Sequence, residues 1–267
     1  MRVRNSLFIS ICLAMLAGCS TLERPPAGAV SDLAPAGKLR AAINLGNPVL
    51  ASRDAGGQVK GVSVDLAREL ARRLGVPLEA IAFDAAGKVV DAGKAGAWDI
   101  AFVALDPARA EDIAQSTPYV VIEGAYLVRD ASPIRGNEEV DRGGNRIAVG
   151  RGSAYDLFLT RTIKQAQILR SATSAAVVDD FVREKYEVAA GVKQQLQADA
   201  KRVPGVRLLP GRFMVIYQAM ASQRGKQAGA RYVREFVEDM KASGFVAKAL
   251  ERHAIEGAAV AAAGDAK

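Results

Sequence analysis

The chain has 267 residues, of which 50% are hydrophobic, 24% charged and 6% aromatic, and its formal net charge is +7. These proportions are ordinary for a globular protein. The basic residues are scattered rather than clustered and aromatic residues are few, which argues against a nucleic-acid-binding face.

The first 18 residues are typical of a secretory signal peptide. Arg2 and Arg4 precede an apolar run at 7–16, which is shorter than the ~20 residues of a membrane-spanning helix. The run ends in Leu-Ala-Gly-Cys, which is similar to a bacterial lipobox, and this resemblance implies that Cys19 becomes a lipidated N-terminus. A buried helix with an incidental cysteine is the alternative. The other cysteine lies in the removable segment, so we expect a mature chain without disulfides.

The segment 19–36 is rich in Pro, Ala and Gly without periodicity, and it predicts a flexible tether. Strand and helix patterns then alternate. The spacing of apolar residues predicts strands at 38–45, 78–83 and 98–105 and helices at 64–74 and 88–95. Such alternation is typical of a mostly parallel sheet flanked by helices.

The alternation restarts after residue 128, which predicts a second unit. We expect strands at 146–149, 166–169 and 187–192, helices at 156–166 and 174–183, a return strand at 214–220, and final helices at 227–242 and 245–252. Two chain crossings, near 123–128 and 211–216, would then place lobe 2 (126–213) within lobe 1 (37–125 and 214–255). The Gly- and Ala-rich sequence of residues 256–267 predicts a disordered tail. Ligands of such open sheets bind beyond the carboxyl ends of the strands, here between the lobes.

Several motifs stand in a diagnostic order: Gly61-Val-Ser-Val-Asp65-Leu, the helix end Leu74-Gly75-Val76, Trp98-Asp99-Ile100, and Arg109. This set resembles the family 3 periplasmic solute-binding proteins, the receptors of polar amino-acid uptake systems, over about 37–253. The resemblance implies a two-lobe α/β periplasmic-binding-protein fold of type II, an ABC permease in the inner membrane as partner, and a monomer without cofactor. It also implies that Arg109 grips the ligand's carboxylate.

Arg109 suits this role chemically, because a guanidinium presents a planar fork of donors that matches a carboxylate. The alternative is a surface arginine in a helix first turn, where its charge is unfavourable. The second candidate element is Gly152-Ser153-Ala154-Tyr155, where a strand passes into a helix whose free N–H groups suit an anion. The alternative is that Ser153 or Asp156 only caps the helix.

The chain departs from the family's pattern at three places. After the first strand, Asn47 is followed by Val49 and Leu50 where the family usually has an aromatic residue that stacks on the ligand. Ala104 and Asp106 replace Thr or Ser; Asp106 could bind a ligand ammonium or pair with Arg109.

The third departure concerns the Asp with which family members bind the ligand's α-amino group. At the matching place, the end of strand 187–192, this chain has Val192 or Lys193, followed by Gln194. A cation there would repel an ammonium and attract a second carboxylate, so the ligand need not be a simple α-amino acid. The alternative is that Lys193 faces solvent.

Catalytic readings find little support in the sequence. The only histidine is His253 near the C-terminus, and no His, Cys and carboxylate spacing suits a metal. One enzyme shares the expected fold, the periplasmic cyclohexadienyl dehydratase, and it would need a general acid such as Asp106, Glu123 or Asp156. A sensory or interaction protein that has lost transport is a further alternative. The favoured prediction is a lipid-anchored solute receptor of the cell envelope with no catalytic residue and no metal.

Overall fold

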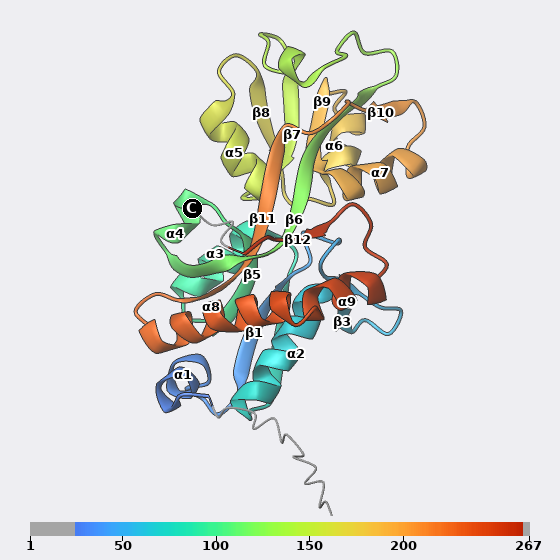
Figure 1. The fold of residues 1–267 in the computed structure, drawn as a ribbon. Coiled ribbons are helices and arrows are strands. Elements are labelled where there is room, and N and C mark those ends of the chain that lie inside the picture. The colour runs from blue at the N-terminus through green and yellow to red at the C-terminus, as the bar shows by residue number, and fades with distance from the viewer. Residues whose placement is uncertain (1–24, 264–267) are drawn as a thin grey trace, which may run out of the picture.

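A computed structural model describes residues 25–263 of the chain. The molecule has two lobes, and the strands β6 (Ile113–Arg129) and β11 (Met214–Gln223) run antiparallel across their junction (Figure 1). Because both strands pair with neighbours on each side, the sheets of the two lobes are joined in one path, in the order β4-β1-β5-β11-β6-β9-β7-β8. The site between the lobes therefore stands on a continuous backbone frame.

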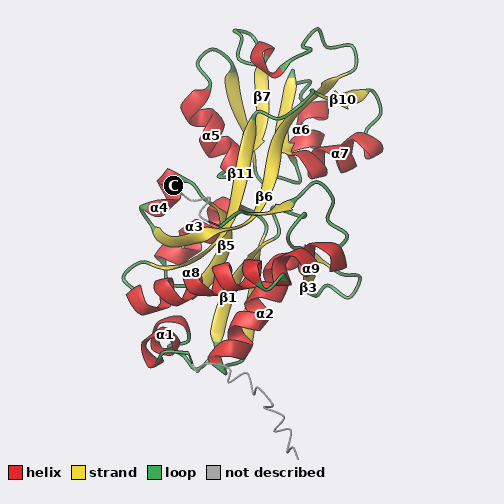
Figure 2. Cartoon of the chain, viewed as in Figure 1, coloured by secondary structure: helices red, strands yellow, loops and turns green. Residues whose placement is uncertain are grey.

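Lobe 1 has a parallel core of three strands, with β1 (Leu39–Asn44) between β4 (Leu78–Phe83) and β5 (Ile100–Ala104). Its helices pack on both faces of this sheet (Figure 2): α2 (Val62–Leu74), α3 (Ala86–Lys94), α8 (Gln227–Ala242) and α9 (Phe245–Arg252). The fully buried Trp98 joins the sheet to α3, because its indole N–H donates to the carbonyl of Val89 over 2.8 Å. Gly93 makes this possible, since a Cβ there would lie 2.5 Å from the ring.

Lobe 2 repeats the scheme around β7 (Arg146–Gly150), which lies between β8 (Gln167–Ser171) and β9 (Val188–Val192). β9 in turn pairs antiparallel with β6, which attaches this lobe to the crossing strands. Further elements are α5 (Ala154–Thr162), α6 (Val177–Arg183), α7 (Lys193–Arg202), the short helix α4 (Pro107–Ala110), a 3-10 turn (Asn137–Glu139), β10 (Val206–Leu208) and the hairpin β2 (Ser52–Arg53) with β3 (Val59–Lys60).

The predicted two-lobe α/β fold with mostly parallel sheets and two crossings is confirmed. The helices predicted at 227–242 and 245–252 and the strand at 78–83 agree with the structure residue for residue. The helix expected at 156–166 instead begins at Ala154 and ends at Thr162, because Ser153 caps it two residues earlier than the apolar pattern indicated.

The segment expected to be an unstructured tether is partly ordered. It contains α1 (Ala27–Leu33), which lies against α8 of lobe 1. Leu33 is fully buried there, and Gly229 admits it, because a Cβ at Gly229 would lie 2.9 Å from a methyl carbon of Leu33. The prediction of a tether through residue 36 is therefore wrong, because composition alone does not register a short helix of seven residues that docks on a distant element.

The tail expected to be disordered from residue 256 is also partly ordered. β12 (Ala259–Val260) pairs antiparallel with Val120 and Val121 of β6, and the N–H of Ala261 donates to the carbonyl of Tyr119 over 3.2 Å. The reason is an edge effect, because this part of β6 has β11 on one side only and its other side offers unpaired backbone groups. The predicted tail is wrong for this stretch.

Among residues 25–263, no helix has both the length and the apolar character needed to cross a bilayer. The predicted signal peptide at 1–18 and the lipid site Cys19 lie outside the described residues.

Candidate functional site

A small cavity of about 30 Å³ lies where the lobes meet. It lies at the carboxyl ends of β1 and β5 in lobe 1 and of β7 and β9 in lobe 2. The residues that line it are Asn44, Gly46, Asn47, Ala86, Ala104, Arg109, Ser153, Ala154, Tyr155, Ser174, Val192, Ile216 and Gln218. Six of the predicted site residues are in this set, namely Asn47, Ala104, Arg109, Ser153, Ala154 and Tyr155. The position agrees with the rule that open α/β sheets bind ligands beyond their strand ends.

Arg109 crosses from one lobe to the other. Its side chain leaves α4, is 3% exposed, and donates from Nη1 to the carbonyl of Ala104 and from Nη2 to the carbonyl of Gly152, each over 2.8 Å. No carboxylate of residues 25–263 forms an ion pair with it. Burial lowers the pKa of the guanidinium to about 10, although the charge of nearby Asp106 acts in the opposite sense. Buried charges are normally paired, so Arg109 is a candidate for binding an anion.

Asp106 forms a second tie between the lobes. Its carboxylate caps α4 by accepting the N–H of Ala108 over 2.9 Å, and it also accepts both Nη groups of Arg161 from α5, over 3.1 and 2.9 Å. The sequence had left two roles open, binding a ligand ammonium or pairing with Arg109. The structure pairs Asp106 with Arg161 of the opposite lobe rather than with Arg109, and the ammonium role stays a prediction.

The Gly152 turn is held by its own helix cap. The hydroxyl of Ser153 accepts the N–H of Asp156 over 3.0 Å, and the Asp156 carboxylate accepts the N–H of Gly152 over 2.8 Å. Ser153 and Asp156 therefore do cap the helix. At this helix start, the N–H groups of Ala154 and Tyr155 have no hydrogen-bond partner among the described residues. Gly152 has a φ of +68°, and a Cβ there would lie 2.8 Å from Cα of Gly87 in lobe 1, so a glycine is needed for this contact.

Neutral polar groups complete the cavity wall. Asn47 is 6% exposed, and neither its amide nitrogen nor its amide oxygen has a hydrogen-bond partner among the described residues. The buried hydroxyl of Tyr155 likewise lacks a hydrogen bond of good geometry. Burial raises the pKa of Tyr155, with Ser174 and Ser153 acting in the opposite sense, so the phenol stays neutral. The cavity is therefore bounded by one cation and several neutral donors and acceptors, and no carboxylate lines it.

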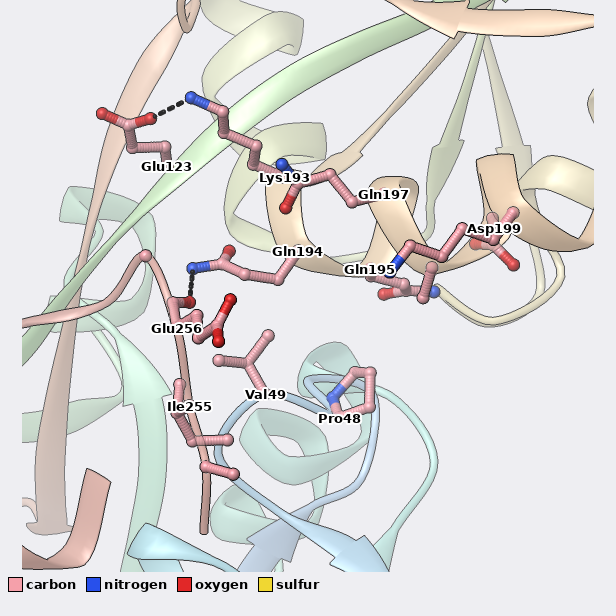
Figure 3. Close-up of a pocket in the computed structure, with 14 residues that line it drawn as sticks. Pro48, Val49, Glu123, Lys193, Gln194, Gln195, Gln197, Asp199, Ile255 and Glu256 are labelled. Carbon is pink, nitrogen blue, oxygen red and sulfur yellow. Dashed lines mark hydrogen bonds and ion pairs between the residues drawn. The ribbon is translucent and has the colours of Figure 1, made fainter. Parts of the chain in front are cut away.

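The remaining predicted residues lie outside the cavity. Leu50 is 2% exposed and belongs to the apolar core of lobe 1. Lys193 and Gln194 line a separate groove of about 730 Å³ between α7 and the segments 48–49 and 254–257 of lobe 1 (Figure 3). Lys193 donates to Glu123 over 2.8 Å, and Gln194 donates to the carbonyl of Glu256 over 3.1 Å. At the end of β9, the residue that lines the cavity is Val192, so Lys193 does not act there.

Sequence reasoning did not select Asn44, Ser174 or Gln218, which line the cavity with their polar side chains. A signal existed for two of them. Asn44 ends a predicted strand at its carboxyl edge, and Gln218 interrupts an otherwise mostly apolar strand that crosses between the lobes. Ser174 was expected at the start of the helix predicted at 174–183, but it lies in the loop before α6, which begins at Val177.

Comparison with known proteins settles the family. A profile of the bacterial extracellular solute-binding proteins, family 3, matches residues 39–255. The chain belongs to this family. A search among curated proteins found no match.

Solved structures share the fold at low sequence identity. One is a solute receptor for L-cysteine of Neisseria gonorrhoeae, 22% identical, with a TM-score of 0.75 over 86% of this chain and 94% of that one. Another is a mutant of ArgBP from T. maritima, 20% identical, with a TM-score of 0.74 over 85% of this chain and 100% of that one. A third is an ancestral amino acid-binding protein described as a precursor of cyclohexadienyl dehydratase, 22% identical, with a TM-score of 0.71 over 84% and 98% of the two chains. At these identities the likeness concerns the fold.

Proposed function

We propose that this family 3 solute-binding protein is the lipid-anchored receptor of an ABC-type uptake system and binds a small carboxylate-bearing solute between its lobes. One observation carries the proposal. Arg109 is a buried guanidinium with five N–H donors, two hydrogen bonds to carbonyls, and no ion pair with a carboxylate among the described residues. A ligand carboxylate would supply the missing charge in a bidentate geometry.

Binding would require the lobes to separate and close again. The cavity of about 30 Å³ is far below the roughly 300 Å³ of common ligand pockets. Opening of the lobes would break the Arg109 contact with Gly152 and the Asp106 pair with Arg161, which both join the lobes. Closure around the solute would restore the Asp106 pair. The closed, liganded form would then be favoured only to the extent that the ligand contacts it better than the open form.

An enzyme of the dehydratase type is the second candidate, because one structural neighbour is described as a precursor of that enzyme. The three carboxylates that could serve as its acid are all engaged: Asp106 by Arg161, Asp156 by Arg170, and Glu123 by Lys193 and Arg212. The hydrogen bond from Lys193, supported by Arg212, holds the pKa of Glu123 below its usual range. A general acid must carry its proton at working pH, so this arrangement favours the receptor.

A thermal-shift screen of amino acids, hydroxy acids, dicarboxylates and small peptides tests the proposal. A ligand present at a hundred times its dissociation constant should stabilise the fold by about 2.7 kcal/mol. No shift with any carboxylate would contradict the proposal, and release of an aromatic product from prephenate or arogenate would favour the enzyme. Lipid attachment is tested separately, since Cys19→Ala should give a folded protein that no longer fractionates with membranes.

A further inference from the structure

The charge of the interlobe cavity limits which carboxylates it can hold. In residues 25–263 its wall contains a single ionic group, the guanidinium of Arg109, and its other polar groups are neutral amides and hydroxyls. An α-amino acid brings both a carboxylate and an ammonium. Only the carboxylate would find an opposite charge here, and the ammonium would be buried near a like charge.

The carboxylates close to the cavity do not alter this balance. Asp106 is bound through both oxygens to Arg161, and Asp156 is bound to Arg170 and to the N–H of Gly152. Neither carboxylate side chain lines the cavity. Lys193, at the start of α7, is directed to Glu123 in the separate groove and adds no charge to the cavity (Figure 3).

The unpaired groups of the wall suit a neutral substituent. Asn47 offers one amide donor group and one acceptor, both buried and both without a partner among the described residues. The hydroxyl of Tyr155 can donate or accept. A hydroxyl or a carbonyl beside the ligand's carboxylate would satisfy them, and neither brings a charge that needs a counterion.

We propose that the preferred solute is a small monocarboxylate whose neighbouring polar group is neutral, such as a 2-hydroxy or 2-oxo acid, rather than a zwitterionic α-amino acid. Arg109 binds the carboxylate, and Asn47 and Tyr155 hydrogen-bond the neutral group. This inference rests on the proposed solute-binding function and specifies its substrate class.

Matched pairs of ligands test the inference by titration calorimetry on the mature protein. The pairs are glycolate with glycine, lactate with alanine, and 2-hydroxyisovalerate with valine, each of which differs chiefly in a hydroxyl for an ammonium. The hydroxy acid should bind at least about tenfold more tightly than the matching amino acid, because the buried ammonium of the amino acid would have no counterion. Equal or tighter binding of the amino acids would overturn the inference while leaving the receptor function intact. Binding of neither class would overturn both.

An isosteric substitution supplies the control. Asn47→Asp keeps the volume of the side chain and places a carboxylate in the cavity wall, so it should narrow or reverse the preference within each pair. Asn47→Ser, which stays neutral, should weaken both members without reversing the order. An unchanged preference in a folded Asn47→Asp protein, checked by its melting transition, would contradict the charge argument.

Discussion

Replacing Arg109 by methionine separates binding from folding. Methionine keeps an unbranched chain in the same buried space but removes the charge and the planar fork. If a ligand carboxylate pairs with Arg109, its loss should weaken binding by about 2 to 5 kcal/mol. This corresponds to a rise in the dissociation constant from about 30-fold to several thousand-fold.

The stability of the ligand-free protein should change much less, because two terms oppose each other. Burial lowers the pKa of Arg109 from 12.5 to about 10, which corresponds to a cost of about 3 kcal/mol for keeping the charged form in the fold. Removing the charge relieves this cost but also removes two hydrogen bonds, to Ala104 and Gly152, each contributing about 1.5 kcal/mol or more. The free energy of unfolding should therefore fall by no more than about 3 kcal/mol.

Titration calorimetry with the tightest carboxylate from the screen, together with urea unfolding, measures both quantities. Arg109→Lys is the matched control, and it should recover part of the affinity, because a point charge does not reproduce the fork. Unaltered affinity in Arg109→Met would refute the ligand role. Loss of the folded state in the same variant would instead identify Arg109 as a structural cation.

Three further predictions concern side-chain packing and ion pairing. Gly152→Ala should impair lobe closure and ligand affinity, because the new Cβ would lie 2.8 Å from Cα of Gly87. The control Gly87→Ala has its nearest contact at 3.4 Å and should bind ligand nearly normally. Equal ligand affinities of the two variants would contradict this explanation. Leu33→Ala should lower the free energy of unfolding by about 2 to 5 kcal/mol, since Leu33 is fully buried against α8; a silent change in urea unfolding would mean that α1 does not dock. Arg72, with Arg73, lowers the pKa of Glu69 from 4.5 to about 2. Ionised Glu69 therefore stabilises the fold above pH ~4.5, and this stabilisation is lost as the pH falls towards 2. The difference in the free energy of unfolding between the protein and Glu69→Gln should shrink over that range.

The fold was largely predictable because its determinants are local and periodic. Apolar spacing located most of the longer helices, and the family's motifs gave the two-lobe order. No helix was predicted at α7, where Leu196 is the one buried residue and the sequence therefore has no apolar periodicity. Two further errors lie in segments whose structure depends on distant partners. Residues 27–33 pack on α8 at a glycine that makes room for Leu33, and residues 259–260 form a strand because one edge of β6 is unpaired. Composition in a short window contains neither fact.

The candidate site was predictable by position and less so by role. Residues expected from strand ends, such as Asn47, Ala104 and Tyr155, do meet in one cavity. The partners of the charged residues could not be foreseen, because they are set by how the lobes face each other. Asp106 meets Arg161 some 55 positions away, and Lys193 meets Glu123 on a crossing strand. A sequence motif gives the position of a charge along the chain but not its neutralising partner in space.

The two interlobe ties also define what a ligand must achieve. In the structure, the carbonyl of Gly152 accepts a hydrogen bond from Nη2 of Arg109, and Asp106 pairs with Arg161. A solute favours the closed form only if its contacts there are stronger than the interlobe contacts it replaces. A ligand that binds the open and closed forms equally does not shift the equilibrium between them. A carbonyl is a weaker acceptor for a guanidinium than a carboxylate is, so an anion can displace Gly152, whereas a neutral solute offers no better partner than the one it replaces. If the proposed function holds, the closed form would disfavour uncharged solutes before any contact with Asn47 or Tyr155 is made.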